Sequence, residues 1–501
     1  MFDFVAEATV RFGLLPGFNA TWTRVIEDRS SASSLFLRSA ANLEGVKAAQ
    51  EEQLAQTRDW KALADILEAA GKRYGVPAGA LARLEELAAG KAAAIVSAQQ
   101  VGYLGGPLYT FLKAYHCVRL ASLLERELGK PLLPIFWLED EDHDLAEIAD
   151  SYYLEESGEI SNAHFSPETP VANFAAGHYE VRASVLDPIR EMTERIGVPR
   201  TTETEALLAE CYAGQTLSDG MGRLLARLLG ERGLLVVEGS HAGLKRLAAP
   251  LWARILDVGP ALHKLLSTRG EFLESLGLPA PLSPTPSAYL FYQMRNDFIR
   301  RVVSYDGTLR DPGGHEETVT LHELRDSITA HPEIVSPKAA LRPLYQDFVL
   351  PTAAYIAGPM EIAYHAQIQP FYKILSVAAP SLFPRLSVTI MDEKTSHLSQ
   401  KVGFTPRRIL ESDFDALAKK MLDRTDDAGI GDSFEETRRK LEEAMRALKP
   451  RGLLSEQGLS TAYFLLRFGR ERLLAALDEV PLDSKKHVVL SVSTEHGVVA
   501  V

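Results

Sequence analysis

The apolar and polar stretches between residues 93 and 144 predict a strand, a helix and a second strand in that order. Residues 93–97 form a short apolar run, as a buried parallel strand does. Apolar side chains recur at helical spacing over residues 108–118 and give that segment one apolar face. Residues 132–138 form a second apolar run, and an acidic cluster, residues 139–144, follows it. This order predicts a βαβ unit with polar groups at the carboxyl edge, where open α/β sheets bind ligands.

A glycine-rich loop joins the first predicted strand to the helix. Gly102, Gly105 and Gly106 allow a sharp turn or the close approach of a ligand. Pro107 suits the first turn of a helix, because its missing N–H would have no partner there. The spacing is not that of the dinucleotide-binding fingerprint, and no Walker lysine follows the glycines. Spacing alone therefore leaves two interpretations open, a ligand-binding loop or a tight turn with close packing of helix on strand.

The composition is that of an ordinary globular protein, with 501 residues, 46% hydrophobic and 24% charged. No apolar run approaches the ~20 residues that a membrane span needs, and the first residues lack the pattern of a secretory signal. The net charge of −13 and the lack of a basic, aromatic-interleaved surface argue against nucleic acid as a partner. Two cysteines, Cys117 and Cys211, form no disulfide framework and no C-x-x-C zinc pair. We therefore expect a cytoplasmic protein without a membrane partner and with no evident zinc site.

Two blocks of sequence resemble one known family. The first block holds Gln99-Gln100, the stretch Gly105-Gly-Pro-Leu-Tyr-Thr110 with Lys113, Phe136-Trp137, and Glu141-Asp-His-Asp144. The second block, residues 337–368, holds L-R-P-L-Y-Q-D, L-P-T-A-A-Y, G-P-M-E-I-A-Y and A-Q in this order. Both blocks resemble the cysteine-adding enzyme of bacillithiol biosynthesis, a cysteine ligase family. The likeness covers roughly residues 90–400 and includes Ser218-Asp219 and the apolar run 233–239.

The resemblance implies both a fold and an activity. The implied fold is α/β, a Rossmann-like parallel-sheet core similar to that of HIGH-type nucleotidyl transferases, with connecting-peptide insertions and a helical C-terminal region. The implied activity is a ligation that joins the carboxyl group of cysteine to the amine of glucosaminyl-malate. A free carboxylate is a poor electrophile, so the resemblance implies ATP with Mg²⁺, most simply through a cysteinyl-adenylate. It also leaves a homodimer open, because the coiled coil through which the family usually pairs looks shortened here.

The two Gly-Pro helix starts are the expected place for the nucleotide. Backbone N–H groups and the helix dipole can bind phosphate there, and a hydroxyl or a cation in the first turns can assist. The expected nucleotide-binding residues are Gly105, Gly106, Thr110, Lys113 and Gly358. For Lys113 the alternative is a solvated helix lysine.

Polar residues near the same edge are the expected substrate and catalytic groups. His143 has a pKa near neutrality and could be the general base for the attacking amine, and the carboxylates beside it could bind the cysteine ammonium. The expected catalytic residues are Glu141, Asp142, His143 and Asp144. The expected substrate-binding residues are Gln99, Gln100, Tyr109, Arg342, Gln346, Asp347, Glu361, Tyr364 and Gln367.

Each group has a plainer interpretation. Asp142 or Asp144 could cap the next helix. Arg342 could form an intramolecular ion pair with Asp347, although its planar fork also suits the malate carboxylates of the implied substrate. The trio of Glu361, Tyr364 and Gln367 could be ordinary helix packing.

The chain also departs from the family pattern. Family members usually read T-G-Q-Q where this chain has Ser97-Ala98-Gln-Gln100, and A-G-E-D-H-D where it has Glu139-Asp-Glu-Asp-His-Asp144. Loss of two glycines and gain of two acids could alter the choice of substrate. The open alternatives are a ligase or nucleotidyl transferase of the same fold with another amino acid or amine acceptor, and a non-catalytic nucleotide-binding scaffold.

The predicted organisation interrupts the core with insertions. The main sheet is expected to resume at Tyr355 and again at residues 386–391, and residues 291–305 are expected to be antiparallel. Ser433 and Glu436 form a capping-box pattern, and residues 486–501 look like a β-hairpin. The predicted units are 1–154, a mostly helical N-terminal segment with the first part of the core; 155–232, a helical insertion; 233–270, a core strand and helix; 271–335, a smaller mixed insertion; 336–404, the second part of the core; and 405–501, a helical, short coiled-coil-like region with a β-like tail.

Overall fold

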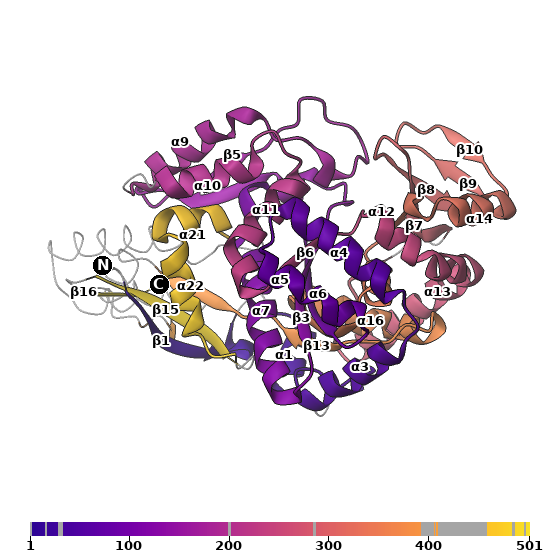
Figure 1. Cartoon of the computed structure of the whole chain (residues 1–501), viewed down its shortest axis with the longest axis horizontal. Helices are drawn as coiled ribbons and strands as arrows, with labels where there is room; N and C mark the ends of the chain where they lie inside the picture. The colour runs from indigo at the N-terminus through magenta and orange to yellow at the C-terminus, as the bar shows by residue number, and fades with distance from the viewer. Residues whose placement is uncertain are drawn as a thin grey trace, which may run out of the picture.

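A five-stranded parallel sheet lies at the centre of this computed structural model (Figure 1). Its strand order is β13-β12-β2-β3-β6. Its strands are β2 (Ala93–Gln100), β3 (Leu132–Glu139), β6 (Leu235–Glu238), β12 (Thr352–Ala357) and β13 (Ser381–Pro384). They are buried along nearly their whole length, as expected for a parallel sheet with both faces covered. The structure describes residues 3–15, 18–28, 34–198, 202–283, 287–391, 405, 407–408, 458–482, 486–494 and 497–500.

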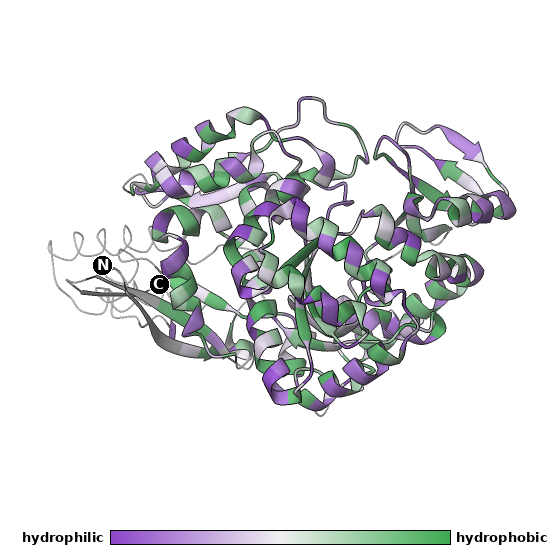
Figure 2. Ribbon diagram, viewed as in Figure 1, coloured by the Kyte–Doolittle hydropathy of each residue, from purple (hydrophilic) through white to green (hydrophobic). Residues whose placement is uncertain are grey.

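Helices cover the sheet. α7 (Leu108–Leu128) packs on β2 and β3, α3 (Leu43–Ala55) packs on β12, and α4 (Trp60–Tyr74) packs on β6. α16 (Pro359–Ile374) follows β12 and packs against α13 (Ala249–Ser275). Hydrophobic residues are concentrated in the central strands, while hydrophilic residues mark the outward faces of the helices (Figure 2). The predicted Rossmann-like α/β core is therefore confirmed. The other N-terminal helices are α1 (Ala20–Glu27), α5 (Ala78–Ala82) and α6 (Leu84–Ala88).

The strand order places a topological switch point between β2 and β12. From β2 the chain proceeds to β3 and β6 on one side, and later returns to β12 and β13 on the other side. In open α/β sheets the crevice outside the carboxyl ends of the strands at such a point is the usual ligand site. The topology alone therefore directs attention to the residues after Gln100 and Ala357.

Two insertions extend from the carboxyl edge. The first contains the hairpin β4 (Asp150–Leu154) and β5 (Ile160–His164), followed by helices. The second is an antiparallel sheet in which β7 (Ala288–Met294) pairs with β8 (Arg300–Ser304), so the antiparallel prediction for this region is confirmed. Further helices and strands between residues 145 and 349 are α8 (Leu145–Ile148), α9 (Leu186–Ile196), α10 (Thr202–Tyr212), α11 (Leu217–Leu229), α12 (Ala242–Leu247), β9 (Thr308–Arg310), β10 (Glu316–Thr318), α14 (Leu321–Ala330), β11 (Val335–Pro337) and α15 (Arg342–Val349).

The two insertions touch each other across a short backbone bridge. Phe174 and Ile299 form an isolated antiparallel pair. The amide of Ala175 donates to the carbonyl of Phe298 at 2.9 Å. The insertions are therefore joined to each other as well as to the core.

A second sheet unites the two ends of the chain. β1 (Asp3–Arg11) pairs antiparallel with β15 (Lys486–Thr494), and β14 (Val388–Met391) pairs parallel with β15. β15 and β16 (Gly497–Ala500) form an antiparallel hairpin, as predicted for the tail.

One expectation about a strand is corrected here. The segment 386–391 was expected in the core sheet, but the last core strand is β13, and β14 belongs to the sheet at the chain ends. Short apolar runs have similar sequences whichever sheet they join, and only the pairing with a neighbouring strand in the folded protein determines that sheet. The N-terminal segment before β2 is mostly helical, as expected, with α1, α3, α4, α5 and α6; the strand β1 precedes these helices and pairs with β15.

The C-terminal part of the chain contributes α21 (Thr461–Phe468) and α22 (Arg470–Asp478). The capping box at Ser433 and Glu436 and the short coiled coil lie outside the described residues. None of the described helices combines the length and the apolar character of a membrane span.

Candidate active site

A buried ion pair between Lys113 and Glu361 lies at the switch point. Lys113 belongs to the second turn of α7 and Glu361 to the first turn of α16, and only 3% and 14% of their side chains are exposed. The Lys113 ammonium also donates to Gln99 Oε1 at 2.7 Å and to the carbonyl of Ala98 at 3.0 Å. Lys113 is therefore no solvated helix lysine, and the switch point joins three of the predicted residues.

Glu361 is held as a carboxylate by several donors. Tyr355 Oη and the amide of Gly358 each donate to it at 2.6 Å. Burial alone would raise the pKa of Glu361, but the Lys113 charge and these hydrogen bonds outweigh burial and lower that pKa. The Gly358 amide therefore binds the carboxylate of its own helix.

Arg342 lies behind this pair and is 7% exposed. Its guanidinium donates to Gln346 Oε1 at 3.0 Å, to Tyr364 Oη at 3.0 Å and to Tyr355 Oη at 3.2 Å. These three partners are neutral, so they orient the arginine without neutralising it. Arg342 thus presents a fixed positive charge at the sheet edge.

Asp347 serves as support one layer deeper. It is fully buried and accepts from Tyr372 Oη at 2.7 Å and from Gln346 Nε2 at 3.1 Å. Burial raises the pKa of Asp347 to about 6. Within this helix Arg342 donates to Gln346, and Gln346 in turn donates to Asp347. A relay of hydrogen bonds therefore replaces the expected ion pair between Arg342 and Asp347.

Arg385 adds another cation beside the same helix start. It follows β13 directly, and its guanidinium lies 5.3 Å from the ring centre of Tyr109. A Cβ atom placed on Gly358 would lie 3.7 Å from Arg385 Nε and 3.8 Å from Lys113 Cε, so the backbone closely approaches both cations. Three cations, Lys113, Arg342 and Arg385, therefore surround the single hydrogen-bonded carboxylate of Glu361. Such an excess of positive charge, most of it buried, favours an anionic ligand, a phosphate or a carboxylate.

The glycine loop before α7 is already engaged by other parts of the chain. The Gly105 amide donates to Tyr212 Oη at 2.7 Å, and the Leu108 amide donates to the carbonyl of Leu459 at 2.9 Å. The Thr461 amide donates to the carbonyl of Gly106 at 2.8 Å. Thr110 is buried, and its hydroxyl has no hydrogen-bond partner among the described residues. Of the two predicted helix starts, that at Gly358 lies beside the cations, whereas that at Gly105 and Gly106 is covered by residues 458–461.

The acidic cluster forms a second group one strand away. Asp142 accepts from Gln100 Nε2 at 2.5 Å and from the His143 amide at 2.6 Å, and Arg300 Nη2 lies 3.4 Å from its Oδ1. Burial opposes ionisation, but the hydrogen bonds from His143 and Gln100 and the Arg300 charge lower the pKa of Asp142. Arg300 also contacts His143 Nδ1. His143 and Asp144 are exposed, and Asp144 precedes α8 without a side-chain capping bond.

Gln99 and Gln100 connect the two groups. As successive residues of β2 they point to opposite sides, Gln99 to Lys113 and Gln100 to Asp142. The structure thus brings most predicted residues to one edge of the sheet.

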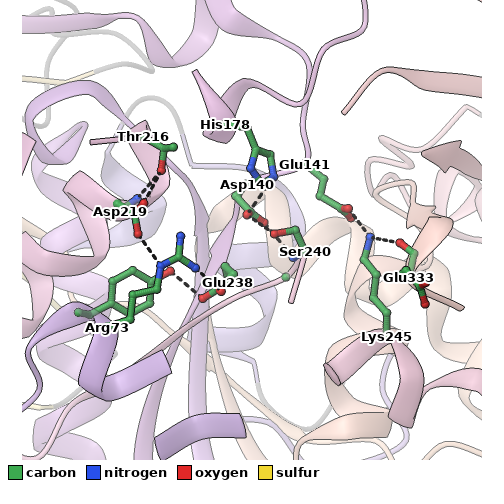
Figure 3. Close-up of polar contacts among 12 residues, drawn as sticks. Arg73, Asp140, Glu141, His178, Thr216, Asp219, Glu238, Ser240, Lys245 and Glu333 are labelled. Atoms are coloured by element: carbon green, nitrogen blue, oxygen red, sulfur yellow. Dashed lines mark hydrogen bonds and ion pairs between the residues drawn. The ribbon is translucent and has the colours of Figure 1, made fainter. Parts of the chain in front are cut away.

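Two predicted residues have other partners. Glu141 is buried in an ion pair with Lys245, which also donates to the carbonyl of Glu333 at 3.4 Å (Figure 3). Gln367 binds both backbone polar groups of Leu282 at 2.9 Å, and so ties α16 to a loop. Both residues stabilise the surroundings of the site.

Neighbouring carboxyl groups at the ends of β3 and β6 also accept hydrogen bonds from nearby residues (Figure 3). Asp140, only 1% exposed, accepts from the Ser240 amide at 3.0 Å and from its hydroxyl, and His178 Nε2 lies 3.6 Å away. Glu238 accepts from Arg73 at 2.8 Å and from Tyr74 at 2.7 Å. These contacts anchor the first insertion and α4 to the sheet edge.

Sequence reasoning missed several members of the site. Glu139 ends β3 and Arg385 directly follows β13, and that position could have indicated them, whereas Tyr355 lies inside β12. Ser240 lies two residues after the buried strand β6 and had the same signal, whereas Arg300 carries none, because it reaches the edge from the second insertion. No group of three or more His, Cys, Asp or Glu side chains suited to a metal ion occurs in the described part of the chain.

The doubly wound parallel sheet with a charged site at its switch point defines a Rossmann-like α/β protein. A family model described as "Bacillithiol biosynthesis BshC, N-terminal Rossmann-like domain" matches residues 16–386, and the chain belongs to this family.

Curated relatives agree with this assignment. A protein of Koribacter versatilis named "Putative cysteine ligase BshC" is 33% identical over 370 residues, which are 74% of this chain and 67% of the relative. Proteins of the same name from Heliobacterium modesticaldum and Geobacillus thermodenitrificans are 31% and 29% identical. Their alignments cover 82% and 81% of this chain, and 76% and 75% of the relatives.

Proposed function

We propose that this protein is an ATP-dependent cysteine ligase that joins cysteine to the amine of glucosaminyl-malate, a step of bacillithiol biosynthesis. The names of its relatives support a cysteine ligase. The observation that carries the proposal is the set of cations around the switch point, the buried Lys113 and Arg342 and the half-buried Arg385. Both ATP and glucosaminyl-malate are anionic, and such a site suits either one.

The geometry supports a division of roles. Lys113 and Arg385 flank the helix start at Gly358 and suit phosphate groups. Arg342, with its planar fork, suits the malate carboxylates. Gln100, Asp142 and His143 lie where the cysteine and the attacking amine would meet. Mg²⁺ would enter with the phosphates of ATP.

The chemistry asked of these residues is mainly positioning and charge stabilisation. Activation of the cysteine carboxyl group, most simply as an adenylate, places negative charge on phosphate oxygens, which preorganised cations stabilise. Gln99 holds Lys113 in place, while Tyr355 and Tyr364 hold Arg342. A fixed arrangement of two reactants converts a bimolecular step into an effectively unimolecular one.

We further propose a cytoplasmic setting, small-molecule substrates, no nucleic-acid or membrane partner, and a homodimer. The net charge of −13 supports the lack of a nucleic-acid partner.

A reaction with cysteine, ATP, Mg²⁺ and glucosaminyl-malate tests the proposal by mass spectrometry. The expected product has the mass of bacillithiol. Binding of ATP without turnover for any amine would contradict the proposal and favour a nucleotide-binding scaffold.

A second candidate is a ligase of the same fold with another amine acceptor. Glu139 and Asp140 stand where the family usually has alanine and glycine, and the Glu139 carboxyl interacts with Arg342. The extra negative charge reduces the attraction of the edge for a dicarboxylate. Product formation with other amines, and none with glucosaminyl-malate, would favour this candidate.

A further inference from the structure

We propose that Glu139 is the proton acceptor for the amine that attacks the activated carboxyl group. This assignment rests on the proposed ligase function and adds a catalytic residue that the family motif does not contain. Its basis is the placement and the free hydrogen-bonding capacity of one carboxyl group.

Glu139 is the last residue of β3, the strand next to the switch-point strand β2. It lies opposite Gln100 in the ladder, and its own carbonyl accepts from the Val101 amide at 3.1 Å. Its side chain is half-buried. The carboxyl group interacts electrostatically with Arg342 and Arg300, and with Glu141 and Asp142.

The neighbouring carboxyl groups at this edge of the sheet already accept hydrogen bonds or form ion pairs. Asp140 accepts from Ser240, Glu141 is paired with Lys245, and Glu361 is paired with Lys113. Asp142 accepts from Gln100 and His143, and donors that stabilise a carboxylate make it a weak base. Among the described carboxyl groups of residues 139–142 and 361, that of Glu139 alone has no hydrogen-bond donor recorded.

The charges that face Glu139 suit proton transfer near neutral pH. Burial raises its pKa to about 7, with the positive charges of Arg342 and Arg300 opposing this rise and the negative charges of Glu141 and Asp142 adding to it. A general base works best when its pKa lies close to the working pH. Glu139 can therefore accept a proton and release it to solvent in each turnover.

His143 is held by two charged neighbours in the acidic group. Its Nδ1 lies 3.1 Å from Asp142 Oδ1 and also contacts the Arg300 guanidinium. A carboxylate only accepts hydrogen bonds and a guanidinium only donates them, so both neighbours engage the same ring nitrogen. His143 therefore belongs to the network around Asp142, and among the described residues no hydrogen bond of that network reaches the Glu139 carboxyl group.

The step balances as follows. The amine nitrogen attacks the activated carbonyl carbon and forms the C–N bond. The bond from that carbon to the phosphate oxygen breaks, and the phosphate group leaves with the electron pair. The nitrogen gives one proton to Glu139, which becomes neutral and later returns the proton to water.

Glu139→Gln tests the assignment, with Glu159→Gln in the exposed turn between β4 and β5 as the matched control. Hydroxylamine, a nucleophile that is uncharged at neutral pH, replaces the amine in a parallel assay of hydroxamate formation with cysteine and ATP. Hydroxamate formation should stay within about 3-fold of the parent, whereas amide formation should fall by about 10²–10⁴-fold in kcat. The limb of the parent kcat profile near pH 7 should disappear.

Different failures are distinguishable. Absence of hydroxamate with the parent protein would refute the proposed ligase function itself. A parent that makes both products, together with a Glu139→Gln variant that keeps kcat and the pH profile, would refute only the role of Glu139. A raised KM for the amine with an unchanged kcat would also refute proton transfer, because it would show binding alone.

Discussion

Lys113 and Glu361 form a buried ion pair that links the second turn of α7 to the first turn of α16. These helices leave the two strands that flank the switch point, so the pair fixes the spacing of the crevice. Tyr355 and Gly358 satisfy Glu361, and Gln99 satisfies Lys113. Replacing only one member of such a fully hydrogen-bonded pair leaves the other charge buried without a partner, which strongly lowers the stability of the fold.

Lys113→Met should destabilise the protein by about 3–5 kcal/mol, because it leaves Glu361 buried without its cation. Urea unfolding followed by circular dichroism measures the loss. The double variant Lys113→Met/Glu361→Gln should lose less than the sum of the single variants, since neither charge remains buried alone. Strict additivity would show that the two side chains do not interact.

The same pair should make stability depend on acid pH. The pKa of Glu361 lies below its ordinary value of 4.5, so the pair stabilises the fold above that pH and is lost as the pH falls below it. The difference in unfolding free energy between the parent and Glu361→Gln should be largest near neutral pH and shrink below about pH 4. A difference that stays constant over this range would mean that Glu361 is not ionised in the fold.

Arg342→Lys should weaken binding of glucosaminyl-malate by about tenfold or more, because lysine keeps the charge but loses the planar fork. Calorimetric titration of the acceptor and of ATP, each alone, measures the effect. Arg310→Lys, at an exposed arginine of β9, is the control. Equal affinities for the acceptor in the parent and in Arg342→Lys would remove Arg342 from the acceptor site.

Gly105→Ala should cost more stability than Gly129→Ala. Both glycines have positive φ angles, 88° and 63°, which alanine adopts at a cost of about 1 kcal/mol. A Cβ atom at Gly105 would also lie 2.9 Å from Leu224 Cδ2 and 3.1 Å from Thr461 Cβ, whereas nothing lies within 4 Å at Gly129. Thermal unfolding should therefore separate the two variants, and equal melting temperatures would show that α21 does not pack on the glycine loop.

Ser240→Ala should destabilise the protein by about 1–3 kcal/mol, because buried Asp140 loses a hydroxyl donor. Ser157→Ala is the control, since its hydroxyl makes an exposed contact of 3.3 Å with Glu155. Thermal unfolding compares the two. An unchanged melting temperature for Ser240→Ala would show that Asp140 is satisfied by other groups.

The sequence predicts the local parts of this architecture well. The βαβ unit from β2 to β3 rests on apolar runs, a helical repeat and turn residues that are close together in the chain, so each element is read from its own residues. The strand β12 and the Gly358-Pro359 helix start are found in the same way. The candidate residues of these segments, such as Gln99 and Lys113, meet because parallel strands bring their carboxyl ends to one edge.

The remainder depends on contacts between distant segments. β14 and β13 are similar short apolar runs, and only the presence of β15 determines which sheet takes β14. Arg300 contacts Asp142 although the two residues are 158 positions apart in the sequence, and the sequence around either residue does not indicate the other as its partner. The burial of Lys113 could not be predicted from the sequence either, because the local sequence of a helix lysine is the same whether the ammonium binds water or Glu361.

The pairing of β1 with β15 has a consequence for the order of folding. A strand at the start of the chain must wait, unpaired, until its neighbour near the other end has left the ribosome. The C-terminal residues that cover the glycine loop arrive just as late. During synthesis the nascent protein therefore has a core that still lacks β15 and the residues that cover the glycine loop. Truncated products without β15 should expose an unpaired strand edge that favours association with other chains.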